Sequence, residues 1–188
     1  MTDENLTDVE LMQAVARGDM GKLGILVQRH QGQSLALAYR TLGNWDQAED
    51  IVQEAFIRVH KAAKRYRPDA KFTTWLYRIV VNLCLDEKRR SHRAGFNIAD
   101  LGEPPSGNPL DDPAAVQEKN EQIMKVWQAL DRLNKRQRMV IVLHRFEGLS
   151  HQEIAGVTGW STSAVESLLV RAYRNLRRDL DPIKNDNF

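Results

Sequence analysis

The feature that most constrains the fold is a stretch of proline, glycine and acidic residues between two blocks with helical patterning. Four of the six prolines lie in residues 94–117, together with three glycines. This stretch also contains four acidic residues and no basic one. Proline breaks helices and removes a backbone donor, so we expect an extended, flexible linker between two separately folded blocks.

Apolar periodicity predicts that the first block is helical. Apolar residues recur at steps of three and four from Ala48 to Tyr66, and Pro68 prevents the helix from continuing. We expect this helix to start at Asp46. Earlier in the chain, Thr7 and Glu10 have the spacing of a capping box, so a short helix should begin there.

Two further helices are expected in the first block. Asp19 should cap a segment that runs, with interruptions, to Gly43. Another helix should start near Thr73 or Thr74 and continue into a basic run that ends at Arg93. The second block shows the same period, with apolar residues that mark one helix up to Leu133 and another up to Gly148. These are Val116, Ile123, Val126, Trp127, Leu130, Leu133, Val140, Ile141, Leu143 and Phe146.

A helix-turn-helix is predicted near the C-terminal end of the second block. Ser150 and Glu153 form a capping box, and Gly159 stands where a tight turn between helices needs a residue that tolerates positive φ. Ser163 with Glu166 is expected to form a second capping box that opens the next helix. The apolar anchors of the two helices are Ile154, Ala155, Trp160, Val165 and Leu168. An ordinary pair of packed helices with a glycine between them is the alternative.

The expected fold class is therefore all-α, with two small helical bundles and a helix-turn-helix in the second. The expected domains are residues 1–93 and 118–188, joined by the linker over residues 94–117. No strand-period alternation and no internal repeat is visible in the sequence.

Charge is unevenly distributed along the chain. Residues 58–93 contain eleven basic and three acidic side chains, whereas the net charge of the whole chain is only +2. Nucleic acid is one expected partner for such a basic segment. Charge alone does not separate this interpretation from the alternative, in which lysine and arginine solvate helix faces.

Composition argues against a secreted or membrane protein and against an enzyme. The single cysteine, Cys84, allows no internal disulfide, and the first ten residues are acidic where a signal peptide would be basic. No apolar run is long enough to span a bilayer, so we expect a cytoplasmic protein. The sequence has no HExxH, CxxC, phosphate-loop or nucleophile-elbow motif, and the histidines are scattered, so no catalytic residue, metal or cofactor is predicted.

Three segments resemble a known family. Residues 48–56 resemble the core-binding helix of sigma factors. Residues 72–82, with the basic run that follows, resemble the promoter-melting helix of the extracytoplasmic-function (ECF) type. Residues 130–178 resemble the domain that reads the upstream promoter element. The chain thus resembles a bacterial RNA polymerase sigma factor of ECF type over residues 7–93 and 118–180.

The resemblance implies that the chain catalyses nothing itself. It implies that the chain binds core RNA polymerase, recognises the −10 and −35 promoter elements and promotes DNA melting for transcription initiation. A stand-alone helix-turn-helix transcriptional regulator is the alternative. An anti-sigma protein is a common partner in the family and is an expectation here.

The family's polymerase-binding residues match the polar face of the helix over residues 48–66. By resemblance, this face docks on the clamp helices of the largest polymerase subunit, and the polymerase flap is a further expected contact. The matching residues are Asp50, Gln53 and Glu54. A metal site formed by Asp50 and Glu54 is an alternative, but that face has no nearby histidine.

The downstream-element contacts are expected on the helix that starts near Thr73. By resemblance, Asn82 and the basic run capture an unstacked base and hold the strand backbone. The matching residues are Arg78, Asn82, Lys88, Arg89, Arg90 and Arg93. Trp75 lies nearby and is at least equally suited to core packing, and Cys84 is interpreted as a small buried hydrophobe.

The upstream-element contacts are expected on the second helix of the helix-turn-helix. The candidates are Thr162, Ser163, Glu166, Ser167, Val170, Arg171 and Arg174. The arginines suit phosphates better than bases. Glu166 suits either a cytosine amino group or a capping role, and we favour capping.

Four residues depart from the family pattern. Asn134 replaces a usual proline, Glu166 and Leu168 occupy positions that are often basic, and Tyr173 replaces a common arginine. These departures leave the upstream sequence preference open.

Overall fold

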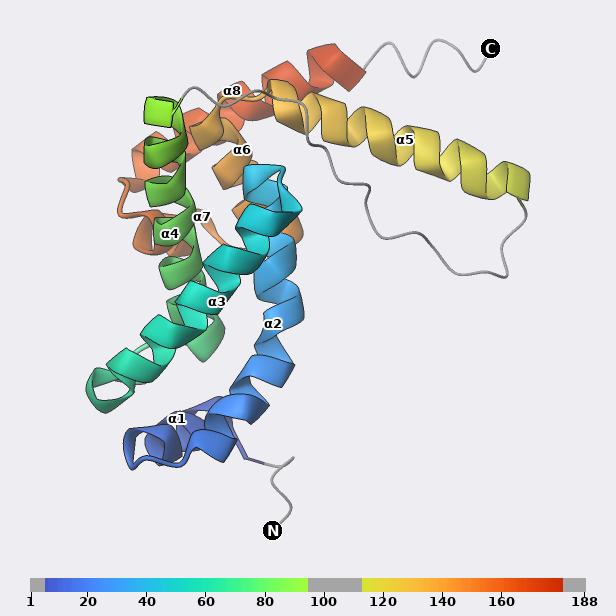
Figure 1. The fold of residues 1–188 in the computed structure, drawn as a ribbon. Coiled ribbons are helices and arrows are strands. Elements are labelled where there is room, and N and C mark those ends of the chain that lie inside the picture. The colour runs from blue at the N-terminus through green and yellow to red at the C-terminus, as the bar shows by residue number, and fades with distance from the viewer. Residues whose placement is uncertain (1–5, 95–112, 181–188) are drawn as a thin grey trace. The chain divides into compact units, whose positions relative to one another are not determined.

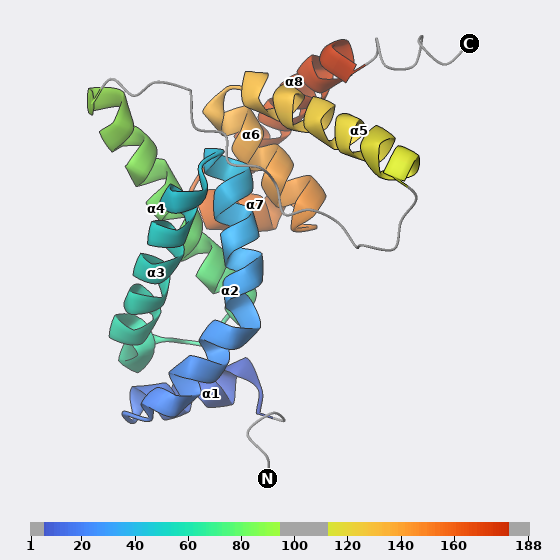
Figure 2. The same ribbon diagram turned by 45° about the vertical axis from the view of Figure 1, so that its right-hand side comes forward.

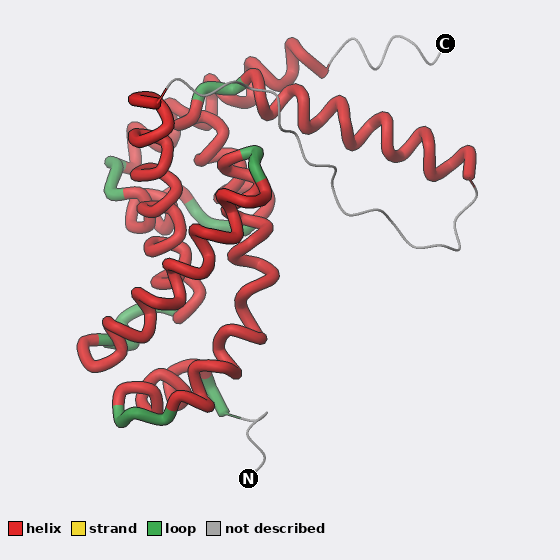
Figure 3. The backbone as a smooth tube through the Cα atoms, viewed as in Figure 1, coloured by secondary structure: helices red, strands yellow, loops and turns green. Residues whose placement is uncertain are grey.

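The computed structural model describes residues 6–94 and 113–180, and it describes side chains over residues 6–87 and 121–180. Every regular element in these ranges is a helix, with no strand among the described residues (Figure 3). The helices fall into two regions separated by residues 95–112. The predictions of an all-helical fold and of two helical regions are confirmed, and the two units are described separately.

The N-terminal unit contains four α-helices and a short 3₁₀ turn within its described residues. Helix α2 lies beside α3, α4 packs against both, and α1 packs against α2 (Figures 1 and 2). Their bounds are α1 Asp8–Ala16, α2 Met20–Leu42, α3 Trp45–Ala62, the 3₁₀ turn Ala63–Arg65 and α4 Phe72–Ala94.

Local capping sets where these helices begin. The predicted capping box at α1 is present: the Thr7 amide donates to Glu10 Oε2 at 2.7 Å, and the Glu10 amide donates to Thr7 Oγ1 at 3.3 Å. Asp19 caps α2, as expected, by accepting from the Lys22 amide at 3.4 Å. Helix α3 differs from the prediction, because Asn44 caps it and places its first residue at Trp45 instead of Asp46.

Helix α2 is continuous, although interruptions were expected. Its internal glycines, Gly21, Gly24 and Gly32, lower helix propensity but do not prevent helical geometry. Burial of one side of the helix outweighs this cost, since Leu26 and Leu37 are fully buried. The helix ends at Gly43, whose φ of 77° lies in the left-handed region.

The core of the N-terminal unit is apolar, and one polar contact ties α1 to α2. The fully buried side chains include Leu11, Met12, Leu26, Leu37, Val59, Leu76, Val80 and Val81. Asp8 Oδ2 lies 2.9 Å from His30 Nε2, and Asp8 Oδ1 lies 3.2 Å from the Arg29 guanidinium. These contacts fix the orientation of α1 at the start of the bundle.

The C-terminal unit consists of the remaining helices. Their bounds are α5 Pro113–Arg132, α6 Lys135–Ile141, a π-helical turn Val142–Phe146, α7 His151–Thr158 and α8 Thr162–Leu180. Helix α8 packs against both α5 and α6. Met139, Leu143 and Val165 are buried in this unit, and Gln137 accepts a hydrogen bond from Asn175 Nδ2 at 3.2 Å between α6 and α8.

Two expectations for this unit are wrong in detail. Residues 113–117 were placed in the linker, but α5 begins at Pro113. Proline is tolerated in the first turn of a helix, because the amide it lacks has no partner there. Phe146 was expected to mark an α-helix with Val140, Ile141 and Leu143, but it lies in the π-helical turn and is 42% exposed.

Candidate functional site

The polar face of α3 carries the three predicted polymerase-binding residues on one side of the helix. The opposite side of α3 is buried, and Ala48, Ala55 and Val59 have no exposed surface. Asp50 and Gln53 are exposed and Glu54 is half-buried. Glu54 accepts a hydrogen bond from Arg58 Nε at 2.8 Å, and this bond holds the pKa of the Glu54 carboxyl below its ordinary value. Asp50 and Glu54 lie toward α4 and Gln53 lies toward α2, and the role of these three residues in binding polymerase stays a prediction.

A polar cleft lies between α3 and α4, beside this face. Its volume is about 480 Å³, and its lining residues are Gln47, Asp50, Ile51, Glu54, Arg58, Leu83, Asp86 and Glu87. The two carboxylates from α4, Asp86 and Glu87, extend the acidic surface of α3 across the cleft. This association was not expected from the sequence, because it depends on how the two helices pack.

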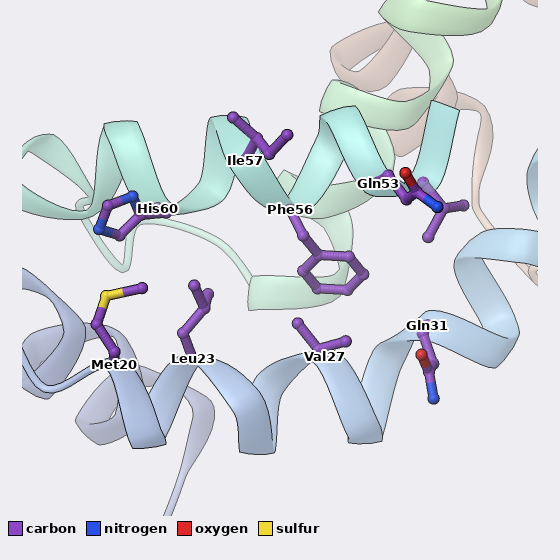
Figure 4. A pocket seen from close by; sticks show the side chains of 9 residues that line it. Met20, Leu23, Val27, Gln31, Gln53, Phe56, Ile57 and His60 are labelled. Carbon is purple, nitrogen blue, oxygen red and sulfur yellow. The ribbon is translucent and has the colours of Figure 1, made fainter. Parts of the chain in front are cut away.

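An apolar groove lies on the other side of α3, between α2 and α3 (Figure 4). Its volume is about 410 Å³, and Gln53 is at its edge. Met20 and Ile57 line it and are 52% and 47% exposed, which is unusual for large apolar side chains. The other lining residues are Leu23, Val27, Gln31, Val52, Phe56 and His60. The sequence offered one signal for this groove, since Ile57 lies outside the apolar stripe of α3.

The outward face of α4 carries two of the predicted downstream contacts. Arg78 and Asn82 are exposed, whereas Leu76, Val80 and Leu83 on the opposite side are buried. The remaining candidates belong to the helical backbone of α4, but their side chains lie outside the described residues; they are Lys88, Arg89, Arg90 and Arg93.

Trp75 packs within an aromatic cluster at the start of α4. Its ring centroid lies 5.0 Å from that of Tyr66 and 5.9 Å from that of Phe72. Trp75 thus takes part in packing, as one interpretation expected, although its side chain is only half-buried. Burial raises the pKa of the Tyr66 hydroxyl, with a smaller contribution from the Asp8 charge. Cys84 is buried, in line with its interpretation as a small apolar residue.

The predicted helix-turn-helix is present as α7, a glycine turn and α8. The Ser150 amide donates to Glu153 Oε2 at 2.9 Å, and the Glu153 amide donates to Ser150 Oγ at 3.3 Å, which completes the predicted capping box. Gly159 in the turn has a φ of 74°. The second predicted capping box, Ser163 with Glu166, is wrong. Ser161 caps α8 instead, by accepting from the Ala164 amide at 3.2 Å.

Helix α8 presents the predicted upstream contacts on its outer side. Val165, Leu169 and Ala172 are buried on the inner side. The exposed candidates are Ser163, Glu166, Ser167, Val170, Arg171 and Arg174, and Thr162 is half-buried. Trp160, just before α8, lies under the Arg136 guanidinium at 5.3 Å, a cation–π contact that the sequence analysis missed because the residues are far apart in sequence.

A pair of histidines faces the exposed side of α8. His151 Nδ1 lies 3.5 Å from Glu166 Oε1, and the His151 ring centroid lies 5.4 Å from that of His144. His144 Nδ1 donates to the Leu149 carbonyl oxygen at 3.0 Å, because a carbonyl can only accept. The sequence analysis did not assign a role to either histidine.

Within the described residues, no group of three or more histidine, cysteine, aspartate or glutamate side chains is arranged to hold a metal ion. Glu54, one of the two residues of the alternative metal site, accepts a hydrogen bond from Arg58 instead. A search of the same residues finds no helix with the length and apolar character needed to cross a membrane.

Comparisons with known proteins give the family. The chain matches the family described as Sigma-70 region 2 over residues 26–94, and Sigma-70, region 4 over residues 123–176. It is 31% identical to the ECF RNA polymerase sigma-E factor of Escherichia coli (strain K12), covering 96% of this chain and 97% of that protein. The chain belongs to the ECF-type RNA polymerase sigma factors.

Other relatives agree with this assignment. The RNA polymerase sigma-H factor of Pseudomonas aeruginosa is 31% identical to this sigma factor, over 94% of this chain and 95% of the relative. Among solved structures, CnrH in complex with the cytosolic domain of CnrY is 30% identical, with a TM-score of 0.65. The match covers 93% of this chain and 97% of CnrH.

The family assignment gives the structural units a function. Region 2 spans most of α2 together with α3 and α4, and region 4 begins within α5 and extends into α8. These regions bind RNA polymerase and promoter elements, and sigma factors are initiation factors without catalytic activity of their own. Asn134, which replaces the usual proline, keeps the start of α6 intact by accepting from the Gln137 amide at 3.0 Å.

Proposed function

We propose that this sigma factor binds core RNA polymerase through the exposed face of α3 and contacts two promoter elements through α4 and α8. In this proposal residues 1–93 bind polymerase and the −10 element, residues 118–188 bind the −35 element, and the stretch between them, whose last residues begin α5, connects them. The observation that carries the proposal is shared by the three helices: each buries an apolar side and exposes the polar candidates.

The polymerase contact uses Asp50, Gln53 and Glu54 against the clamp of the largest subunit. The face is acidic, and the carboxylates of the adjacent cleft extend it, so a basic partner surface is electrostatically complementary. The flap of the polymerase is the proposed partner of the C-terminal unit. Since polymerase and promoter are found in the cytoplasm, that is where we place this sigma factor.

The downstream contact uses Arg78 and Asn82, together with the basic residues at the end of α4: Lys88, Arg89, Arg90 and Arg93. An amide can pair with a base edge, and arginine and lysine neutralise the strand backbone. Unstacking a base costs roughly a few kcal/mol, which such contacts can offset. Binding energy alone therefore suffices to stabilise strand separation, with no covalent step.

The upstream contact uses the outer side of α8: Thr162, Ser163, Glu166, Ser167, Val170, Arg171 and Arg174. The arginines are suited to phosphates on either side of the major groove, and residues in the first half of the helix are suited to base edges.

An anti-sigma protein is a further proposed partner. The related CnrH is seen in complex with the cytosolic domain of CnrY. The apolar groove between α2 and α3 adjoins the polymerase face at Gln53, so a protein bound there would compete with polymerase.

Reversal of charge on α3 tests the polymerase contact. The double variant Asp50→Lys/Glu54→Lys is expected to lose association with purified core polymerase and to lose transcription from genomic fragments. The control is Asp69→Lys/Glu121→Lys, which makes the same charge change at exposed positions outside the proposed surfaces. Circular dichroism checks that both variants fold. Unchanged association of the α3 variant would refute the assignment of this face.

A further inference from the structure

Glu166 lies on the exposed side of α8, where its carboxylate is available for contacts with DNA. It is the fifth residue of α8, and its side chain is 56% exposed. Ser161 supplies the cap, and stabilisation of a helix by a carboxylate fades beyond the first turn. The capping role that the sequence favoured for Glu166 is therefore removed, and its exposed carboxylate, with one oxygen near His151, can still accept a hydrogen bond from a base.

Resting on the proposed function of α8, we propose that Glu166 specifies cytosine at one position of the upstream element. A carboxylate accepts hydrogen bonds and cannot donate them. In the major groove, guanine presents only acceptors, thymine presents an acceptor and a methyl group, and adenine presents an acceptor beside its amino group. Cytosine alone presents an amino donor with no acceptor beside it, so it is the base that a carboxylate binds without repulsion.

Val170 extends this recognition to a neighbouring base. It follows Glu166 by one helical turn on the same side and is 59% exposed, the largest value among the exposed large apolar residues of the described chain. An apolar side chain in the major groove fits the methyl group of thymine. One helical turn advances about 5.4 Å and one base step about 3.4 Å, so the thymine lies within about two base pairs of the cytosine.

His151 is a positioning residue for Glu166. Its Nδ1 lies 3.5 Å from Glu166 Oε1, so this oxygen is directed toward α7 and Oε2 is left for the base. The His151 ring also contacts His144, whose Nδ1 donates to the Leu149 carbonyl oxygen. A carboxylate held in this way discriminates between bases more sharply than one free to rotate.

The test is a selection with reconstituted holoenzyme, made from the full-length chain and purified core polymerase. The probe is a pool of linear duplexes with random sequence, and bound molecules are recovered and sequenced. Wild type is expected to enrich cytosine at one upstream position and thymine within about two base pairs of it, each by at least about fivefold.

Substitutions at Glu166 and Val170 are expected to change different bases of the selected sequence. Glu166→Gln is expected to change the enriched base from cytosine to adenine, because a glutamine amide pairs with both adenine groups. Val170→Ala should lose the thymine and retain the cytosine. The matched control, Glu121→Gln on α5, is exposed and outside the proposed surfaces, and it should leave both bases unchanged.

Failure of this inference is distinguishable from failure of the proposed function. If wild-type holoenzyme enriches a two-part motif but Glu166→Gln retains cytosine, the assignment of Glu166 is wrong and the function of α8 stands. If the holoenzyme enriches no motif, the proposed function itself fails.

Substitution of His151 in the wild-type and Glu166→Gln backgrounds tests whether His151 acts through Glu166. His151→Ala should lower the preference for cytosine without changing which base is preferred, and His151→Lys should restore it. In the Glu166→Gln background, His151→Ala should have no further effect on base preference. An equal loss in both backgrounds would show that His151 acts only through the general structure of the helix-turn-helix.

Discussion

At the residue scale, the Glu54 carboxylate stays accessible to a partner although it forms an ion pair with Arg58. Glu54 is held by Arg58, but both side chains are more than 40% exposed, at 42% and 45%. Ion pairs of this kind contribute little to stability, so a basic group of a partner can replace Arg58 at small cost. The ion pair between Glu54 and Arg58 therefore does not prevent polymerase from binding to this face of α3.

Asn82 is the residue on which we base a prediction for strand separation. Asn82→Ala is expected to slow open-complex formation about fivefold or more, because the amide that pairs with an unstacked base is lost. The measurement is permanganate reactivity of promoter thymines over time. Association with polymerase should remain unchanged, since Asn82 is exposed on α4 and is not among the proposed polymerase contacts.

The control for Asn82→Ala is Gln13→Ala, which removes an exposed amide from α1, outside the proposed surfaces. It should open the promoter at the wild-type rate. Equal rates for wild type and Asn82→Ala would contradict the assignment of Asn82 to the melted strand.

The exposure of side chains was predictable from the sequence where it depends on near neighbours in the chain. The exposure of Asp50, Gln53 and Asn82 follows from the period of their own helices. The pairing of His151 with Glu166 and the cleft position of Asp86 depend on how two helices cross, which no local pattern encodes. Ser161 was missed as the cap of α8 because Ser163 offers the same local signal two residues later.

At the scale of elements, the glycine turn of the helix-turn-helix gives a prediction with an internal control. A Cβ at Gly159 would touch nothing within 4 Å, so Gly159→Ala is strained only by its φ of 74°. We expect a loss of about 1 kcal/mol in the free energy of unfolding. Gly156→Ala, within α7 and also free of contacts, should instead gain roughly 0.5–1 kcal/mol.

Urea denaturation of both glycine variants measures these changes. A loss at Gly156 as large as that at Gly159 would contradict the conformational origin of the effect.

The capping box of α1 gives a prediction that depends on pH. The Thr7 amide and then its hydroxyl lower the pKa of Glu10, so the charged form is favoured in the folded state. This stabilisation is present above the ordinary pKa of glutamate and is lost as the pH falls through the lowered pKa. Wild type should thus melt at a higher temperature than Glu10→Gln at neutral pH, and the difference should disappear in acid.

Thermal melting of both proteins over a pH series measures this difference. Thr7→Val removes the hydroxyl but keeps the amide, and it should reduce the pH-dependent part without abolishing it. A difference that persists unchanged in acid would exclude the charge of Glu10 as its cause.

Helix boundaries followed from the sequence where a cap was unambiguous. Thr7, Asp19 and Ser150 mark helix starts as expected. The start of α5 at Pro113 was hidden by the proline-rich composition around it, because the same residue suits both a linker and a first helical turn. The π-helical turn before α7 and the exposure of Phe146 within it were not expected from the apolar period of that segment.

At the scale of the whole molecule, the small DNA-binding surfaces proposed on α4 and α8 imply weak DNA binding by the chain without polymerase. Each unit offers few contacts, and simultaneous binding of both depends on how their spacing is fixed. The free chain is expected to bind a promoter duplex at least about 100-fold more weakly than the holoenzyme. Its affinity should also fall steeply with salt, because phosphate contacts dominate.

Fluorescence anisotropy with a labelled duplex, at two salt concentrations, measures this difference. Tight and sequence-specific binding by the free chain, without stimulation of transcription, would support the stand-alone regulator instead.

The all-helical class and the two-part organisation were predictable because periodicity and proline content are properties of the sequence itself. The hollows beside α3 were not, because they form where packed helices leave their surfaces incompletely matched, which no pattern within a single helix encodes.

Helix α3 forms one wall of both the apolar groove toward α2 and the polar cleft toward α4. A substitution on α3 can therefore change an apolar surface and an acidic surface at the same time.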